Sequence, residues 1–478
     1  MAATDAPVPK LQARAAACAK RLLEADRVLL VSHIDADGLT SAGIAATALE
    51  RAEISFEATF EKQLDEASIA AIADREFSTV LFTDFGSGQL DIITEHERAG
   101  DFVPVVADHH RPADADTEYH LNPLLEGIDG ASELSGAGAS YLLARELAAK
   151  APGETRHDNR DLAALAIVGA VGDMQVSEGA LRGANAAIVA EGVEADVLRE
   201  TKDLTMYGKQ TRPLPKLLEY ASDVRIPGIT NDERGAVSFL DGLDVSCRGE
   251  ESWKRWVDLT DDEKRTVASA LVRHAVNRGV PGFKIDRLVG TSYVLLEVAV
   301  GTELRDASEF STLLNATARY ERADVGLAVC LGDRDSALDR ARELLRNHRR
   351  NLSEGIEWVE TNGVTETEHL QWFDAGDEIR ETIVGIIAGM SMGAEGVSRD
   401  RPIVAFAEKN DEETKVSSRG TGPLVGDGLD LSAVMGEAAR AVGGDGGGHD
   451  IAAGATIPSD EREAFIERAD RIAGEQLG

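Results

Sequence analysis

The sequence predicts an α/β protein with a mostly parallel sheet in its N-terminal part and a second, smaller α/β domain at its C-terminal end. From about residue 11 to residue 190, short apolar runs alternate with alanine-rich amphipathic stretches, a pattern typical of parallel strands joined by helices. The chain has 478 residues, which exceeds the usual size of one hydrophobic core, so two or more domains are expected.

In the N-terminal part, three apolar runs predict strands and two alanine-rich runs predict helices. The strand candidates are RVLLV at 27–31, STVLFT at 78–83 and DFVPVVA at 101–107. The helix candidates are 39–52 and 135–150. The second of these begins among serine and glycine, as a capped helix does.

A breaker-rich stretch at 207–235 indicates a connector. The elements expected beyond it are an acidic helix near 250–278, a strand at 291–300, a helix at 309–323, a strand at 325–332, a charged helix at about 335–360, a strand at 401–409 and a glycine cluster at 442–458. We therefore expect three parts, with boundaries at 1–205, 206–360 and 361–478.

The charge balance is strongly acidic. The chain has 85 acidic and 50 basic residues, a formal charge of −35, which by itself disfavours a polyanionic partner because nucleic-acid binding depends on neutralised phosphates. Only 12 of the basic residues are lysine. An acid-rich, lysine-poor surface is typical of a high-salt cytoplasm, where counterions relieve the repulsion. The charge therefore indicates a halophilic habitat more than a partner.

The cysteines and the apolar runs indicate the compartment. Cys18, Cys247 and Cys330 are far apart in the sequence, which favours a reducing environment without disulfides. Lys10 and Arg14 interrupt the N-terminal alanines, so we expect no signal peptide. No apolar run reaches the roughly 18–20 residues that a membrane span needs. We expect a cytoplasmic protein with no membrane contact.

Side chains of metal-binding type recur where the predicted strands and helices end. They are His33, Asp35 and Asp37 after the first strand, Asp84 after the second, Asp108, His109 and His110 after the third, and Asp173 at the end of an apolar helical run. Ligands bind beyond the carboxyl ends of parallel strands, so these groups should converge. Carboxylates at contact distance need cations. Oxygen donors with few imidazoles suit Mn²⁺ or Mg²⁺, here two ions about 3.5–4 Å apart that share one carboxylate.

Each of these groups alone has an ordinary explanation. A single aspartate after a strand is usually a helix cap or a turn residue, and a pair of histidines usually lies on the surface or in a satisfied core. Capping does not require His33, Asp35 and Asp37 on alternate positions followed by Gly38. The combination therefore favours a metal site.

HIDADG, TDFG, ADHH and VGD, in this order across residues 33–173, resemble the four motifs of the DHH phosphoesterase superfamily. GGGHDIAAG at 446–454 resembles the glycine-histidine signature of the DHH-associated domain. The segment 304–320 is most similar to the archaeal RecJ-like branch. This resemblance implies a parallel-sheet DHH domain, a connecting middle region and a DHH-associated substrate-binding domain, with a cleft between the first and the last.

The resemblance also implies roles for the residues of these four motifs. One ion would be held by His33, Asp35 and Asp84, and the other by Asp37, Asp84, His109 and Asp173, with Asp84 as the bridge. Asp108 would orient an imidazole, and His110 would face the substrate phosphate and protonate the leaving oxygen. Many RecJ-like proteins carry aspartate where this chain has His33, so the sequence departs from the family pattern there.

Substrate binding is expected from the C-terminal domain. Closely spaced glycines, Gly447 and Gly448 among them, can bring backbone N–H groups close to a phosphate, and His449 adds a donor. Arg419, beside Ser418, offers a fork-shaped phosphate partner. A glycine cluster alone is usually a mere loop, but beside the DHH motifs we interpret it as part of a phosphate clamp.

We therefore expect a metal-dependent phosphoesterase that hydrolyses single-stranded DNA or RNA from an end, in repair, replication or RNA turnover. One alternative is a phosphodiesterase for short oligonucleotides or cyclic dinucleotides. An alternative of another class is a replisome scaffold associated with GINS, since RecJ-like proteins resemble the DHH-derived factor that joins that complex. Every metal-ligand position of the motifs carries a ligand-type residue, which argues against a purely structural role. A nuclease that also binds GINS remains an alternative.

Overall fold

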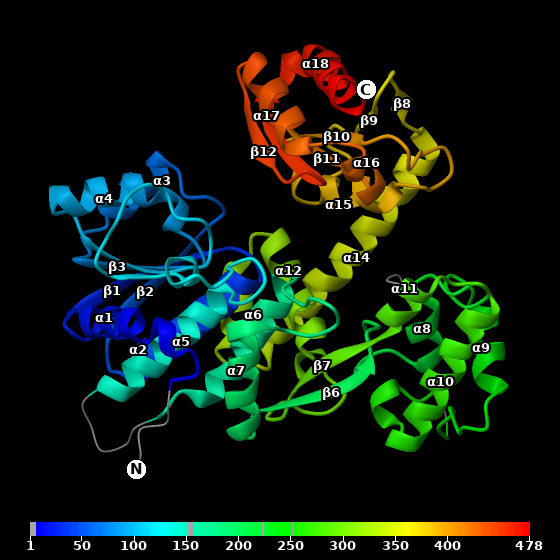
Figure 1. The fold of residues 1–478 in the computed structure, drawn as a ribbon, viewed down its shortest axis with the longest axis horizontal. Helices are drawn as coiled ribbons and strands as arrows, with labels where there is room; N and C mark the ends of the chain where they lie inside the picture. The colour runs from blue at the N-terminus through cyan, green and yellow to red at the C-terminus, as the bar shows by residue number, and fades with distance from the viewer. Residues whose placement is uncertain (1–5, 152–156, 222–223, 251) are drawn as a thin grey trace. The chain divides into compact units, whose positions relative to one another are not determined.

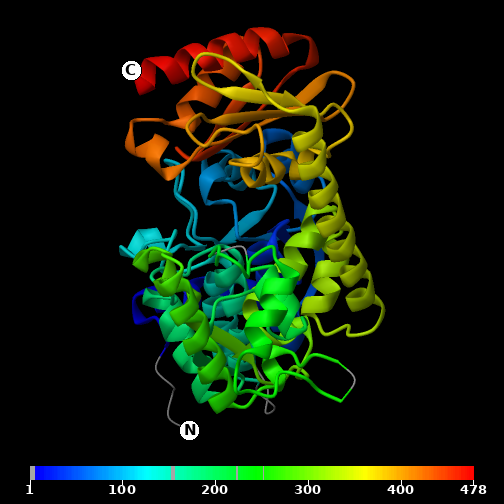
Figure 2. The same ribbon diagram turned by 90° about the vertical axis from the view of Figure 1, so that its right-hand side faces the viewer.

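The computed structural model describes residues 6–151, 157–221, 224–250 and 252–478 (Figure 1). The chain forms two compact units, Met1–Ala341 (unit 1) and Arg342–Gly478 (unit 2). Their boundary falls within α14 (Ser336–Asn362), which Figure 2 shows as one continuous helix. Within the described ranges, no helix combines the length and the apolar character that crossing a membrane requires.

Unit 1 is built on a parallel sheet with the strand order β2-β1-β3-β4-β5. The strands are β1 (Arg27–His33), β2 (Ser55–Glu61), β3 (Thr79–Thr83), β4 (Val103–Ala107) and β5 (His120–Leu121). The chain reverses its direction of winding between β1 and β3. In open α/β sheets, ligands bind at such a switch point, beyond the carboxyl ends of the strands.

Helices cover both faces of this sheet, with α3 and α4 on one face and α1, α2 and α5 on the other (Figure 1). Their bounds are α1 (Gln12–Leu23), α2 (Ala36–Arg51), α3 (Glu66–Ala73), α4 (Leu90–Ala99), α5 (Gly136–Lys150) and, packed on α2 and α5, α6 (Ala163–Gly172). Nearly every residue of α2 is buried, because this alanine-rich helix lies between the sheet and its neighbours. Leu29, Val31 and Phe82 fill the opposite face with side chains from α3 and α4.

The remainder of unit 1 contains an antiparallel strand pair and a small helical core. The elements are α7 (Gly183–Glu194), β6 (Leu198–Leu204), α8 (Leu214–Glu219), α9 (Glu233–Asp241), α10 (Asp261–Asn277), α11 (Gly282–Ile285), β7 (Val289–Leu295), α12 (Ala307–Arg319) and α13 (Ala323–Cys330). Strands β6 and β7 pair with each other. The stretch at 207–235, expected to be a connector, contributes α8 and the start of α9, and its Leu214, Leu217 and Ile226 are buried in the helical core.

Unit 2 is a mixed six-stranded sheet with the order β12-β13-β11-β10-β9-β8. Its strands are β8 (Thr365–Glu366), β9 (Gln371–Asp374), β10 (Ile403–Glu408), β11 (Glu413–Arg419), β12 (Asp445–Gly448) and β13 (Ala452–Pro458), and its helices after α14 are α15 (Glu381–Ser391), α16 (Gly422–Gly426), α17 (Leu431–Ala441) and α18 (Arg462–Leu477). Only β9 and β10 pair in parallel. Helices α17 and α18 cover one face and α15 covers the other (Figure 1).

The fold class is confirmed, with a parallel sheet in the N-terminal unit and a second α/β unit after it. The predicted strand at 325–332 is wrong, because this run belongs to helix α13. A short apolar run fits a buried helix as well as a strand. Here the helix packs against α2, where Gly43 leaves room for Cys330: a Cβ on Gly43 would lie 2.7 Å from the Cβ of Cys330.

Candidate metal centre

The HIDADG segment lies at the carboxyl end of β1 and runs directly into α2. His33 is the last residue of the strand, Asp35 is the N-cap of α2, and Asp37 lies in its first turn. One oxygen of Asp35 accepts a hydrogen bond from the Gly38 N–H at 2.8 Å, and the other lies 3.2 Å from Nδ1 of His33. Asp35 therefore caps the helix and still presents an oxygen to the site, so the two explanations of this aspartate are compatible.

Gly38 is required by a close approach of the backbone. A Cβ at this position would lie 2.1 Å from the carbonyl oxygen of His33. Any larger residue would push the start of α2 away from the end of β1. The glycine thus keeps His33, Asp35 and Asp37 within one turn of backbone.

Asp84 occupies the centre of the cluster. It follows β3 with a left-handed backbone (φ 63°) and its side chain is buried. Its Oδ1 lies 3.3 Å from Nε2 of His109, and its Oδ2 lies 3.6 Å from Nδ1 of His33. Burial raises the pKa of Asp84, but the interactions with His109 and His33 outweigh it and hold the pKa well below its ordinary value. Asp84 is therefore a carboxylate with one oxygen directed at each histidine.

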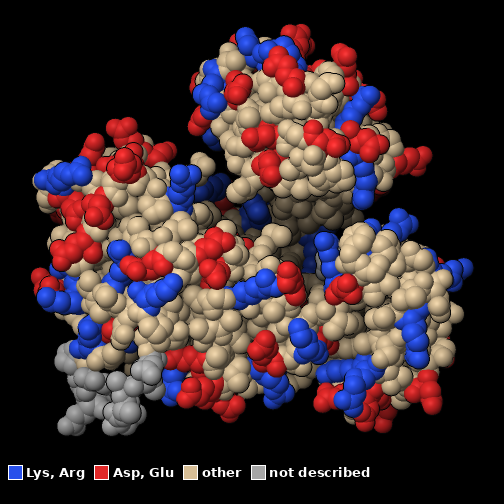
Figure 3. Space-filling view, viewed as in Figure 1, with Lys and Arg blue, Asp and Glu red and all other residues tan. Residues whose placement is uncertain are grey.

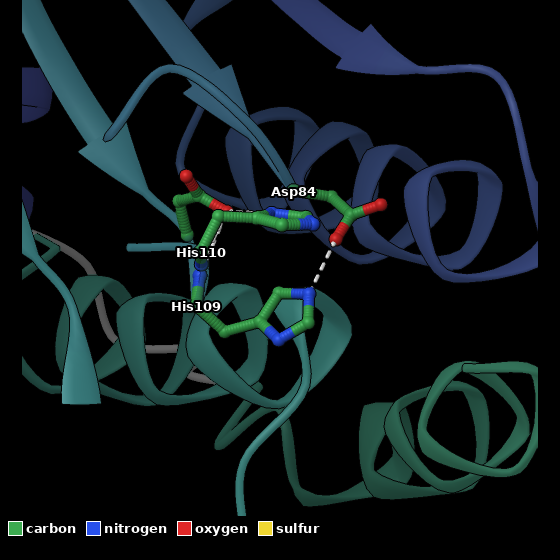
Figure 4. Close-up of side chains that lie close together, drawn as sticks. Asp84, His109 and His110 are labelled. Atoms are coloured by element: carbon green, nitrogen blue, oxygen red, sulfur yellow. Dashed lines mark hydrogen bonds and ion pairs between the residues drawn. The ribbon is translucent and has the colours of Figure 1, made fainter. Parts of the chain in front are cut away.

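The orientation of His109 fixes which of its nitrogens faces the carboxylates. Its Nδ1 lies 2.7 Å from the carbonyl oxygen of Gly130 and must donate to it. In the neutral imidazole, Nε2 then carries a lone pair. This nitrogen faces Oδ1 of Asp84 at 3.3 Å (Figure 4), and oxygens of Asp37 and Asp173 at 3.8 Å each. Either a proton on Nε2 or a cation must lie between these atoms. Burial lowers the pKa of His109, but Asp84 and the neighbouring carboxylates outweigh it and raise that pKa.

The carboxylates around His109 also need a cation. Burial and the neighbouring charge of Asp84 raise the pKa of Asp37 well above its ordinary value. Burial likewise raises the pKa of Asp173, although His109 opposes the shift. Asp37 stays partly satisfied because its two oxygens accept hydrogen bonds from the N–H groups of Gly136 (2.7 Å) and Ala137 (3.0 Å) at the start of α5. Asp37, which is buried, and Asp173, which is half-buried, cannot both ionise beside Asp84 without a positive charge nearby.

The donor set suits a divalent ion with oxygen ligands. Two groups of three residues each place one donor atom per residue within 4.8 Å of the others in the same group. The first group is His33, Asp35 and Asp84, and the second is Asp37, His109 and Asp173. Among the described residues, Nδ1 of His33 and Oδ1 of Asp84 are buried and have no hydrogen-bond partner. Adjacent ligands of an octahedral ion with bonds of 2.0–2.1 Å are about 3 Å apart. The separations of 3.2–3.8 Å between the histidine nitrogens and the carboxylate oxygens are close to this spacing.

Asp108 orients His110 and the backbone around it. Its Oδ1 accepts from the N–H of His109 at 2.7 Å and lies 2.8 Å from Nδ1 of His110, while its Oδ2 accepts from the Ser87 N–H at 2.9 Å. Burial raises the pKa of Asp108, but His110 outweighs it and lowers the pKa to about 2. In turn Asp108 raises the pKa of His110, whose side chain is 54% exposed. Asp108 thus holds the His110 imidazole at the edge of the metal cluster and favours its protonated form.

Two residues that support the cluster were not predicted. Gln175 donates through Nε2 to Oδ2 of Asp173 at 2.8 Å and to the Gly130 carbonyl at 2.9 Å, so it joins the two sides of the His109 pocket. Asn315 of α12 accepts from the Ala36 N–H at 3.1 Å, between Asp35 and Asp37. The only sequence signal for Gln175 is its position two residues after Asp173, and Asn315 is too distant in sequence to give one.

Comparison with known proteins identifies the family. The model of the DHH family N-terminal domain matches residues 27–170, the DHH-CID domain matches 206–289, and the DHHA1 domain matches 369–475. An uncharacterized protein of Methanocaldococcus jannaschii is 30% identical over 458 residues, which cover 94% of each chain. This chain belongs to the DHH superfamily. The resemblance in the motifs is thereby confirmed.

Solved structures show that this DHH protein has a RecJ-like fold. RecJ from Thermus thermophilus in complex with Mn²⁺ matches with a TM-score of 0.61 and 18% identity, over 98% of this chain. The chain spans only 55% of that protein's length. A second exonuclease RecJ, bound to manganese, matches with a TM-score of 0.60 and 17% identity over 98% of this chain and 95% of its own. CDC45 from Entamoeba histolytica matches with a TM-score of 0.62 and 11% identity, over 96% and 97%.

In the DHHA1 domain, Arg419 and His449 lie at the same end of the sheet. Arg419 is the last residue of β11 and pairs with Ala452 of β13. The N–H of His449 donates to the carbonyl of Ala452 at 2.9 Å, at the turn between β12 and β13. The two residues therefore flank Ala452 on either side, two strand spacings or about 10 Å apart. His449 is exposed, so both can face one phosphate-bearing ligand.

The other predicted substrate contacts of this DHH protein lie differently. Gly447 and Gly448 belong to β12 and pair with β13, so the glycine cluster is a hairpin and not an open loop. Ser418 is fully buried, and its hydroxyl donates to the carbonyl of Ala453 at 3.2 Å. Its side chain therefore links β11 to β13 next to Arg419 and does not face the surface.

Proposed function

We propose that this DHH protein is a two-metal phosphodiesterase that hydrolyses single-stranded nucleic acid from an end. The observation that carries the proposal is the position of Asp84, which directs one oxygen toward His33 and the other toward His109. A single carboxylate placed between two groups of donors is the arrangement that a pair of bridged ions requires.

The proposed ligands follow from these two groups. The first ion would be held by His33, Asp35 and Asp84, and the second by Asp37, Asp84, His109 and Asp173. Oxygen donors dominate both sets, so Mn²⁺ or Mg²⁺ is the expected metal. When bound, such ions activate water and offset the charge of a phosphate under attack.

The protein groups around the ions have separate tasks in this mechanism. Gly130 and Gln175 fix the directions in which His109 and Asp173 point. Asp108 raises the pKa of His110, and this imidazole is partly exposed, so in its protonated form it can give a proton to the leaving oxygen of the substrate. Asp108 keeps Nδ1 of His110 engaged, which leaves Nε2 as the nitrogen that delivers the proton.

A cavity of about 580 Å³ adjoins the proposed centre and is large enough for one nucleotide. His33, Asp84 and His110 line it, together with the cations Lys62 and Arg111. Lys62 pairs with Glu321 at 2.5 Å, whereas Arg111 forms no ion pair within the described part of the chain. We assign Arg111 to a phosphate oxygen of the substrate. In the DHHA1 domain, we assign Arg419 and His449 to the binding of substrate phosphate.

The test is hydrolysis of end-labelled single strands of DNA and RNA in the presence of Mn²⁺ or Mg²⁺. We expect release of mononucleotides from one end, with loss of activity in Asp84→Ala. Strands labelled at the 5′ and the 3′ end give the polarity. Activity that survives Asp84→Ala, or that needs no divalent ion, would contradict the mechanism.

Two further functions remain as candidates. A phosphodiesterase for short oligonucleotides or cyclic dinucleotides would cleave a dinucleotide faster than a strand of thirty nucleotides, and the same assay with both substrates decides between them. The RecJ-like fold is also found in CDC45, so a scaffold that binds GINS is the second candidate. Capture of GINS by Asp84→Ala, in parallel with the nuclease assay, separates a scaffold from an enzyme that also has this partner.

A further inference from the structure

Unit 1 contains a second cavity, of about 730 Å³, that none of the proposed metal ligands lines. Its walls come from β6, from β7, from α10 and from the segment that precedes α12. The basic residues that line it are Arg199, Lys202, Lys209, Lys264, Arg265 and Arg305. In a chain with a formal charge of −35, such a group of cations around one cavity needs an explanation.

The acidic residues at the floor of this cavity are already engaged. Asp203 accepts from the indole N–H of Trp256 at 2.7 Å, and Asp306 caps α12 through the Ser308 N–H at 3.0 Å. The Nζ of Lys209 lies 3.8 Å from Asp203 and 3.3 Å from Asp306, and this lysine is buried. Lys209 and the two aspartates therefore form a closed network. The third acidic residue that lines the cavity, Asp261, is exposed in the first turn of α10.

Four of the remaining cations have no acidic partner among the described residues, and one of them, Lys202, donates to the Thr291 hydroxyl at 3.0 Å. Arg199 is exposed on β6, and Lys264 is half-buried on α10. Arg305 donates only to the backbone carbonyls of Leu296, at 2.9 Å, and of Val298. Burial lowers the pKa of Arg305, and the charge of Arg199 lowers it further, so the positive potential between them is not neutralised. Elsewhere acidic and basic side chains are interspersed, as the face in Figure 3 shows.

The register of the strands explains how these cations meet. Arg199 of β6 lies opposite Val294 of β7, and Val294 also bridges to Asp306, the residue after Arg305. Arg199 and Arg305 are therefore brought to the two sides of one strand by backbone pairing. Val294 and the exposed Val300 add apolar surface to the same cavity. Charged and apolar walls together suit a ligand that has both an anionic and a flat apolar part.

We propose that this cavity binds a nucleotide, with its phosphate on Arg199, Lys264 and Arg305 and its base on the valines. The nucleotide is either free or part of a nucleic-acid strand. Guanidinium groups suit phosphate because they present two parallel N–H donors. The site is separate from the metal centre, so its occupation does not require that centre to be catalytic.

The experiment measures binding to the full-length protein in EDTA, where hydrolysis is absent. The probes are a fluorescein-labelled single strand of twenty thymidylates, adenosine monophosphate and inorganic phosphate. The variants are Arg199→Gln and Lys264→Gln. Arg273→Gln is the matched control, because it removes one charge from an exposed position of α10 that does not line the cavity. Asp84→Ala is included so that the metal centre is tested separately.

If the ligand is a strand, both variants bind the labelled strand about tenfold more weakly, and the slope of log K against log salt falls by about one. If the ligand is a free nucleotide, both variants lose adenosine monophosphate while the strand binds as before. Arg273→Gln should match the wild type in either case. Equal binding of all probes by both variants and by Arg273→Gln overturns the proposal. Loss of nuclease activity in Asp84→Ala with this pattern intact shows that the two sites are independent.

Discussion

Nε2 of His109 lies 3.3 Å from Oδ1 of Asp84, and because Nδ1 donates to the Gly130 carbonyl, a neutral His109 would direct the Nε2 lone pair at this carboxylate oxygen. A proton or a metal ion between them resolves this opposition. Oδ2 of the same aspartate is 3.6 Å from His33. The proposed bridge therefore depends on the charge of one side chain, which gives the most direct test of the metal centre.

Asp84→Asn keeps the shape of the side chain but removes its charge and one acceptor. We expect it to weaken both ions, and the loss of affinity should exceed the about 10- to 100-fold that outer ligand partners cause. Titration with Mn²⁺, followed by isothermal calorimetry, measures the number of ions bound. Asp91→Asn, on the exposed side of α4, is the control and should bind both ions. Unchanged stoichiometry in Asp84→Asn would rule out the bridging role.

Gln175 should affect one ion more than the other. Its Nε2 holds Asp173 at 2.8 Å and does not contact His33 or Asp35. In Gln175→Leu we expect an about 10- to 100-fold loss of affinity at the site of Asp173, with the other ion retained. Two resolved binding steps in the same titration check this. If both steps weaken equally, Gln175 acts through the fold as a whole.

Gly136 should tolerate no side chain. A Cβ there would lie 2.2 Å from Oδ1 of Asp84 and 2.8 Å from its Cα, so relief requires movement of the backbone. For Gly136→Ala we expect a loss of about 1–3 kcal/mol in the free energy of unfolding and weaker metal binding. Gly282→Ala is the control, since a Cβ there would meet nothing within 4 Å. Unfolding by urea measures the stability of the two variants. Equal stability of Gly136→Ala and Gly282→Ala would contradict the prediction.

The sequence predicts the parallel sheet and the metal cluster because both depend on local patterns. The apolar strands β1, β3 and β4 are largely buried; β1 ends at His33, and β3 and β4 are each followed directly by an aspartate. The edge strand β2 escaped prediction because its sequence, SFEATFE, is mostly polar and half exposed. Asn315 could not be predicted, since a hydrogen bond across 279 residues leaves no spacing to recognise. Gln175 lies only two residues from Asp173, but its second bond, to Gly130, spans 45 residues.

Asp108→Asn should change the pH dependence of hydrolysis. The negative charge of Asp108 raises the pKa of His110, and its removal lowers that pKa. If His110 donates a proton to the leaving group, less of the acid form is present at alkaline pH, and the alkaline limb of the kcat profile moves to lower pH. Single-turnover rates between pH 6 and about 10 measure the shift. His110→Gln should lack this limb altogether, and an unmoved limb in Asp108→Asn would exclude His110 as the proton donor.

Glu309 should make the stability of unit 1 depend on pH. It is buried, its oxygens accept from the Gln210 N–H and the Thr211 hydroxyl at 2.8 Å each, and burial raises its pKa from 4.5 to about 7. The folded state then binds the proton more tightly than the unfolded state, so the contribution to stability is complete below about pH 4.5 and is lost as the pH rises through about 7. Glu309→Gln cannot titrate. We expect the free energy of unfolding of the wild type, relative to this variant, to fall between pH 5 and about 8, as measured by urea unfolding at each pH. Glu303→Gln, in the turn before α12, is the control, and a difference between wild type and Glu309→Gln that does not change with pH would show that Glu309 stays ionised in the folded protein.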